Sequence, residues 1–168
     1  MGEVYKARDT RLDRIVAIKT SRTEFSERFE REVRTVASLN HPNICQLYDL
    51  GALPEGGSYL VMEFVDGSPI APVDSPRKLL DLAVQIADGM AAAHLAGFTH
   101  RDLKPDNILV TGPATPQPGR VKILDFGLAK LSSSIQQYEA TQTITAVTNS
   151  GTVMGTVSYM SPEQARGA

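Results

Sequence analysis

The chain has 168 residues, enough for one domain of ordinary size and too few for two. Hydrophobic residues make up 42% and charged residues 21%, as in a globular protein, and a formal net charge of -2 gives no basic field for nucleic acid or acidic lipid. Cys45 is the single cysteine, which excludes an internal disulfide and a multi-cysteine zinc site. Residues 1–19 lack the apolar core of a signal peptide and no apolar run is long enough to cross a membrane, so we expect a cytoplasmic chain.

The first part of the chain predicts a small, strand-rich unit with one helix. Apolar runs bounded by turn residues predict strands at residues 4–7, 15–19, 44–50 and 58–64. Phe29, Val33 and Val36 recur at helical spacing, which predicts a helix over residues 24–39. Pro42 ends this helix, because proline is excluded from a helix interior and disfavours helix at the residue before it.

The second part of the chain predicts a helical unit. Residues 67–76 contain several prolines and predict a linker, and Ser75 and Pro76 are suited to start a helix over residues 77–96. One stripe of this helix is apolar and should face the core: Leu79, Leu82, Ile86, Met90 and Ala93. Short strands are predicted after the helix, at residues 108–110 and 121–124.

The most informative stretch is HRDLKPDN, residues 100–107, on a loop between the long helix and a short strand. Asp102 and Asn107 lie in this loop, and Asp125 follows the next short strand. Oxygen-bearing side chains at loop and strand ends suit a hard cation such as magnesium, which is usually held together with substrate phosphates. A loop aspartate taken alone is more often a solvated turn residue, and the surrounding motif is what favours the functional interpretation.

A lysine and a glutamate upstream can supply a charge pair. Lys19, in the run VAIK, gives a fixed positive charge on a strand, and Glu32 shares a helix face with Phe29 and Val36. Glu32 could therefore pin that lysine. The competing interpretation is that Glu32, within RFEREVR, belongs to a solvated helix face, because mixed charges of this kind are typical of such a face.

Five motifs occur in an order that resembles a eukaryotic-type (Hanks-type) Ser/Thr protein kinase, of the kind also found in bacteria. They are VAIK (16–19), the helix with Glu32, HRDLKPDN (100–107), DFG (125–127) and GTVSYMSPE (155–163), in which Ser161 replaces the family's usual alanine. The resemblance covers nearly the whole chain and implies an α+β, bilobal, protein-kinase-like fold that is incomplete. We expect a partial N-terminal lobe over residues 1–66 and part of the C-terminal lobe over residues 67–168.

The resemblance implies ATP-dependent transfer of a phosphoryl group to Ser or Thr hydroxyls of protein substrates. Asn107 and Asp125 would hold Mg²⁺, or Mn²⁺, ions that bridge the phosphates of ATP. Asp102 would accept the proton of the substrate hydroxyl. Lys104, which marks Ser/Thr specificity in the family, would neutralise the transferring phosphoryl group.

The resemblance also implies an ATP-binding site. Lys19, paired with Glu32, would hold the α- and β-phosphates. The segment from Glu63 to Val65 would read adenine through its backbone, with Met62 as the gatekeeper at the back of the pocket. The other expected contacts come from the phosphate loop and from the surfaces above and below adenine: Gly2, Val4, Ala17 and Leu109. A hydrophobic stack linking the lobes is expected from Val36, Leu47, His100 and Phe126.

The ends of the chain differ from the family pattern. Gly2 and Val4 match only the last positions of the family's G-x-G-x-x-G-x-V loop, and the chain stops soon after Glu163. We therefore expect a fragment, whose parent protein could be membrane-anchored through another segment. Two hypotheses stay open: a Ser/Thr protein kinase present as a fragment, and a non-catalytic kinase fragment or pseudokinase-like binding module.

Regulation is expected in the Ser/Thr-rich segment that follows the DFG motif. In the family, an arginine in the place of Arg101 generally accompanies activation by phosphorylation in this segment. We expect phosphorylation at Thr152 first, and at Thr148 and Ser150 next. A phosphate adds negative charge and acceptor oxygens, and its expected receivers are Arg101, Lys130 and Arg28. A dimer would allow autophosphorylation.

Overall fold

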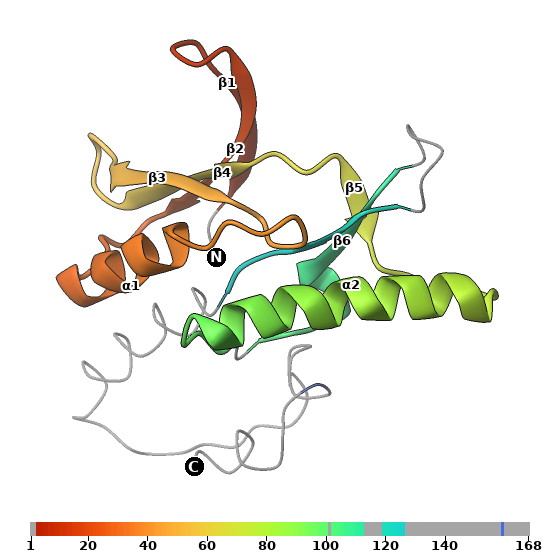
Figure 1. Cartoon of the computed structure of the whole chain (residues 1–168). Helices are drawn as coiled ribbons and strands as arrows, with labels where there is room; N and C mark the ends of the chain where they lie inside the picture. The colour runs from red at the N-terminus through yellow and green to blue at the C-terminus, as the bar shows by residue number, and fades with distance from the viewer. Residues whose placement is uncertain (1–2, 101, 113–118, 127–158, 160–168) are drawn as a thin grey trace, which may run out of the picture.

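The computed structural model describes residues 3–100, 102–112, 119–126 and 159, leaving aside the side chains of Arg28 and Glu32. A twisted sheet with one short helix lies beside a long helix and a smaller sheet (Figure 1). In chain order the elements are β1 (Val4–Asp9), β2 (Arg14–Ser21), α1 (Glu27–Ala37), β3 (Leu47–Ala52), β4 (Ser58–Glu63), β5 (Gly67–Pro69), α2 (Pro76–Leu95), the short 3₁₀ helix η1 (Pro105–Asn107), β6 (Ile108–Thr111) and β7 (Val121–Ile123).

The first sheet is antiparallel, with the strand order β1-β2-β4-β3. The strands predicted for this part of the chain all form, although β3 starts at Leu47 rather than at Ile44. Ile44 instead forms a parallel bridge with Ile123 of β7, and the N–H of Cys45 donates to Ile123 O at 2.8 Å. Strand β3 begins later than its β propensity suggests, because Ile44 and Cys45 pair with Ile123 of β7 instead of with β4.

Helix α1 begins after Ser26, slightly later than predicted. The Ser26 side chain accepts a hydrogen bond from the N–H of Phe29 and caps the helix. The inner face of α1 packs on one face of the first sheet, in a cluster formed by Phe29, Val33, Leu47 and Leu60. Lys19 of β2 lies directly opposite Leu60 of β4, so the lysine emerges on this same face of the sheet.

Helix α2 begins as predicted, with Ser75 as its cap and Pro76 in its first turn. Most of its predicted core stripe is in or against the core: Leu82, Ile86, Met90 and Ala93. The prediction is wrong for Leu79, which is exposed, because β7 contacts α2 around Gln85 and Gly89, beyond the first turn. Neither α2 nor any other helix of the described residues is long and apolar enough to span a membrane.

The second sheet has the order β5-β6-β7, and its first strand lies in the predicted linker. Gly67 pairs with Thr111 and Pro69 with Leu109, so the linker prediction is wrong at its start. A Cβ on Gly67 would lie 2.7 Å from Val110 O, which leaves no room for a side chain. Pro69 is tolerated because β5 is an edge strand, where a missing N–H donor breaks no ladder hydrogen bond.

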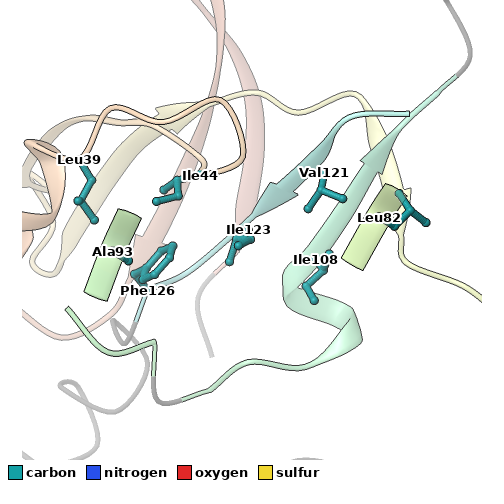
Figure 2. Close-up of a cluster of buried hydrophobic side chains, with 8 residues drawn as sticks. All are labelled: Leu39, Ile44, Leu82, Ala93, Ile108, Val121, Ile123 and Phe126. Carbon is teal, nitrogen blue, oxygen red and sulfur yellow. The ribbon is translucent and has the colours of Figure 1, made fainter. Parts of the chain in front are cut away.

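The larger core cluster joins the two parts of the chain. Figure 2 shows its buried side chains, which are Leu39, Ile44, Leu82, Ala93, Ile108, Val121, Ile123 and Phe126. Val36 packs against this cluster, whereas Leu47 belongs to the cluster under α1. Burial of a large aliphatic side chain stabilises a fold by about 1.5–3 kcal/mol. The segment that follows α1 is therefore held against the second sheet by Leu39 and Ile44.

Candidate active site

Charged side chains from the two sheets meet between them. Lys19 comes from β2, and Asp125 follows β7; the Lys19 Nζ–Asp125 Oδ2 distance is 2.6 Å. Asp125 has a φ of 53°, in the left-handed region that non-glycine residues rarely adopt. Such backbone strain is concentrated at functional sites, where the surrounding structure holds it in place. The contact brings together the expected phosphate-binding lysine and one expected metal ligand.

The loop before β6 holds a second group of polar side chains. Asn107 Nδ2 donates to Asp102 O at 2.8 Å and to Asp102 Oδ2 at 3.2 Å. Lys104 Nζ lies 3.2 Å from the same Oδ2 atom, and the Asp102 side chain is 11% exposed. Two donors thus fix the orientation of the carboxylate through one oxygen and leave Oδ1 as the atom that can face an acceptor substrate.

His100 connects this loop to the residue before Asp125. Its Nδ1 accepts the N–H of Asp102 at 3.3 Å, so Nε2 carries the proton and donates to Leu124 O at 2.8 Å. Burial lowers the pKa of His100 below its ordinary value of 6.5, although the hydrogen bond to Leu124 and the nearby carboxylates oppose this. Its ring lies 4.7 Å from the Phe126 ring, which confirms contact between two members of the expected stack.

The Glu63 side chain is engaged on the other side of the first sheet. Lys122 Nζ of β7 lies 2.7 Å from Glu63 Oε2, which also accepts the N–H of Gln46 at 3.2 Å. The thiol of Cys45 donates to Glu63 O at 3.6 Å, and burial is the main cause that raises the pKa of this thiol to about 12. Sequence reasoning missed Lys122; the available signal was a lysine inside an otherwise apolar strand.

Several residues expected around adenine lie on the face of the first sheet that carries Lys19. Ala17 is opposite Met62, and Val4 is opposite Lys19. Residues directly opposite or two apart in a sheet share a face. Leu109 lies on β6 of the second sheet, and Val65 follows β4. The structure therefore groups Val4, Ala17 and Met62 and places Leu109 on the other sheet.

The opposite face of the first sheet carries a cavity of about 630 Å³. Val16, Ile18 and Val61 contribute to its lining. These residues alternate with Ala17, Lys19 and Met62 along β2 and β4, so their side chains point to the other face. The cavity is therefore separate from the candidate active site.

Some of the expected site residues lie outside the described part of the structure. They are Gly2, Arg101, Lys130, Thr148, Ser150 and Thr152. The backbones of Arg28 and Glu32 lie in α1, but their side chains are not described. The pairing of Lys19 with Glu32 and the receivers of an activating phosphate therefore stay predictions.

The donor set fits a cation that is held jointly with a ligand. Asp125 offers carboxylate oxygens, and Asn107 uses Nδ2 on Asp102, which leaves its amide oxygen as the metal-binding atom. Within the described ranges, no cluster of three or more His, Cys, Asp or Glu residues could hold a metal. One carboxylate and one amide are typical of a Mg²⁺ site that is completed by phosphates and water.

Comparisons with known proteins identify the family of the chain. Residues 1–167 match the protein kinase domain. The chain is 43% identical to the serine/threonine-protein kinase PknA of Mycobacterium tuberculosis (strain ATCC 25177 / H37Ra), over 99% of this chain and 39% of that protein. It is 40% identical to the serine/threonine-protein kinase PrkC of Bacillus subtilis (strain 168), over 99% of this chain and 25% of that protein. The chain thus spans less than half the length of these relatives.

A solved structure shows the same fold. The crystal structure of Rad53 1-466 in complex with AMP-PNP matches with a TM-score of 0.66 and 32% identity, over 76% of this chain and 35% of that one. This likeness confirms the predicted fold class. The first sheet with α1, and α2 with the second sheet, correspond to an incomplete kinase-like fold.

Proposed function

The chain belongs to the protein kinase domain family, and we propose that it transfers the γ-phosphoryl group of ATP to Ser or Thr hydroxyls of protein substrates. The observation that carries this proposal is the pair of polar groups described above, Lys19 with Asp125 and Asp102 with Lys104 and Asn107. The names of the relatives PknA and PrkC support Ser/Thr as the acceptors. The AMP-PNP in the Rad53 structure supports ATP as the donor.

On the nucleotide side, Lys19 and Asp125 have complementary tasks. The Lys19 ammonium is a donor to phosphate oxygens, and Asp125 together with Asn107 would hold a magnesium ion. When bound, that ion would offset the negative charge of the phosphates and keep them in place. Lys19 Nζ and Asp125 Oδ2 lie 2.6 Å apart, so both groups are close enough to engage the same phosphates.

On the acceptor side, Asp102 orients the substrate hydroxyl and takes its proton. The hydroxyl oxygen forms a bond to the γ-phosphorus while the bond from that phosphorus to the β–γ bridging oxygen breaks, so ADP is released. Lys104 lies 3.2 Å from Asp102 Oδ2 and offsets the charge of the phosphoryl group as it moves. Asn107 holds the Asp102 backbone and carboxylate together, so both donors limit the rotation of the base.

Phosphorylation within the chain is part of the proposal. The hydroxyls of Thr152, Thr148 and Ser150 are the proposed acceptors, and their support is the Ser/Thr-rich sequence after the DFG motif. Incubation with ATP followed by peptide mass spectrometry should find phosphate on this cluster. The Asp102→Ala variant serves as the blank. If no phosphate is found between residues 148 and 152, the proposed acceptor sites are wrong, and the chain is phosphorylated elsewhere or not at all.

The direct test of the function is the Asp102→Ala variant. Phosphoryl transfer to a generic protein substrate should fall by about 10²–10⁴-fold, the usual size of a general-base contribution. Affinity for ADP, measured by calorimetry, should stay the same, because Asp102 is assigned to the acceptor. The matched control is Asp106→Ala, which removes an exposed carboxylate from the same loop.

Two outcomes would contradict the proposal. Turnover of Asp102→Ala within about tenfold of the unmodified protein would remove Asp102 from its assigned role. An absence of transfer by the unmodified protein, with nucleotide binding intact, would favour the non-catalytic binding module.

A further inference from the structure

Two side-chain amides that the proposed chemistry does not use connect the segment between α1 and β3 to α2 and β7. We call this pair, Asn43 and Gln85, the amide clasp. Asn43 in this segment is 6% exposed. Its Nδ2 donates to Gln85 Oε1 of α2 at 3.1 Å and to Val121 O of β7 at 3.0 Å. One buried amide group therefore joins a segment of the first lobe to both a helix and a strand of the second.

Gln85 completes this clasp from the helix. Its Oε1 accepts a second hydrogen bond, from the N–H of Val121 at 2.9 Å, and its Nε2 donates to Gly119 O at 3.4 Å. One turn further along α2, a Cβ on Gly89 would lie 2.9 Å from Ile123 Cδ1 and 3.3 Å from Asn43 Cβ. The helix thus approaches β7 and Asn43 closely, and a side chain at residue 89 would require Ile123 and Asn43 to shift.

Backbone hydrogen bonds hold β7 along the same edge, the one that faces away from β6. The N–H of Ile123 donates to Asn43 O, and the N–H of Cys45 donates to Ile123 O, both at 2.8 Å. Strand β7 has only three residues, and Asp125 comes two residues after its end. The N–H of Leu124, between them, donates to Asn107 O at 2.8 Å. The position of β7 therefore determines where the backbone of Asp125 lies.

We propose that Asn43 and Gln85 are positioning residues for Asp125, because their amide clasp fixes β7 against α2 and against the segment that follows α1. The inference rests on the proposed function, in which Asp125 holds the magnesium ion that accompanies ATP. Residues that orient metal ligands without binding the metal themselves commonly change metal affinity or activity by about 10–100-fold when they are mutated. The clasp acts through the backbone of β7, because both amides bond to the backbone of Val121.

One amide acts in the clasp mainly as a hydrogen-bond donor and the other mainly as an acceptor, so substitutions can test each role separately. Gln85 works mainly as an acceptor, since Oε1 receives N–H groups from Asn43 and Val121. Asn43 works as a donor, since its Nδ2 serves two oxygens. Gln85→Glu keeps the acceptor and should be tolerated. Asn43→Asp should not be tolerated. It places a carboxylate oxygen against Gln85 Oε1 and Val121 O, so negatively charged oxygens face one another without a proton between them.

The experiment measures ADP affinity by calorimetry with and without Mg²⁺, in the purified protein and its variants. The ratio of the two affinities isolates the metal-dependent part of binding, which a general loss of stability would not change selectively. Gln85→Leu and Asn43→Asp should lower this ratio by about tenfold, while Gln85→Glu and the exposed control Lys78→Gln should keep it. If Asn43→Asp does not fold, Asn43→Ser is judged by the same criterion.

Asp125→Asn separates this inference from the proposed function. It should abolish the Mg²⁺ dependence outright. If Asp125→Asn retains that dependence, the metal role in the proposed function is wrong. If Asp125→Asn loses it while Gln85→Leu and the Asn43 variants retain it, the proposed function stands and the positioning role is overturned. Equal losses in Gln85→Glu and Gln85→Leu would also overturn the clasp, because the acceptor atom would then not matter.

Discussion

Two lysine–carboxylate pairs link the first sheet to the region of the second, and they differ in what surrounds them. Lys19 and Asp125 meet at 2.6 Å with side chains 30% and 24% exposed, on the face of the first sheet that carries Ala17 and Met62. Lys122 and Glu63 meet at 2.7 Å on the opposite face of that sheet, with side chains 12% and 25% exposed. The same chemistry therefore occurs on both faces of the first sheet.

Neighbouring groups give the two pairs different roles. Glu63 Oε2 also accepts the N–H of Gln46, and Lys122 Nζ lies 3.4 Å from Ile44 O, so each member of this pair has a further protein partner. Lys19 and Asp125 are half-buried groups that a nucleotide and its metal can engage. We therefore propose that the first pair serves nucleotide binding and catalysis and that the second pair connects the sheets. The following variants test this difference.

The largest expected effect is on activity, in Lys19→Met. Loss of a preorganised charge beside the transferring phosphates should lower the rate of phosphoryl transfer by about 10²–10³-fold. The free energy of unfolding should change by about 1 kcal/mol or less, because partly exposed ion pairs contribute little. Steady-state kinetics and urea unfolding measure the two effects. A stable, fully active Lys19→Met protein would contradict the assignment.

Lys122→Met should show the reverse pattern. The Lys122 ammonium is the more buried partner, and its removal leaves both the Glu63 carboxylate and Ile44 O without this donor, which costs about 1–3 kcal/mol of stability. The loss should be seen as a lower urea midpoint by circular dichroism. The double variant Lys122→Met with Glu63→Gln should recover part of it, because the orphaned charge is gone. Failure of the second change to recover any stability would argue against a coupled pair.

A smaller effect is expected from pH through His100. Its pKa is lowered in the folded protein, so below its ordinary value of 6.5 the unfolded chain binds the proton more readily. Stability should therefore rise with pH up to that value and level off above it. Urea unfolding between about pH 5 and about pH 7.5 should show this slope, and His100→Gln should reduce it. An unchanged slope in the variant would assign the effect to other groups.

The sequence predicted what depends on local pattern. Ser26 and Ser75 cap their helices as the short-range signals indicate, and the motif residues Asp102 and Asn107 lie in contact in one loop. Those contacts join residues close in sequence, where spacing and the family resemblance are informative. The roles of these residues in catalysis stay predictions until the variants are measured.

Contacts between distant residues were not predictable from pattern. Strand β5 forms inside a proline-containing segment because β6 offers it an edge, and nothing within residues 67–69 indicates this. The Lys122–Glu63 pair joins residues 59 apart and the Asn43–Gln85 clasp joins residues 42 apart. A single sequence records neither which side chains meet across such separations nor that Leu79 lies beyond the reach of β7.

The difference between the two lysines can be measured in a single labelling experiment. An acyl-phosphate derivative of ATP transfers its acyl group to a lysine amine that lies beside the bound phosphates, and ATP is released. Peptide mass spectrometry should find the label on Lys19 and Lys104, with free ATP suppressing it, and should find Lys122 unlabelled. ATP-protected labelling of Lys122, or no ATP-protected lysine among the three, would contradict the proposed nucleotide site.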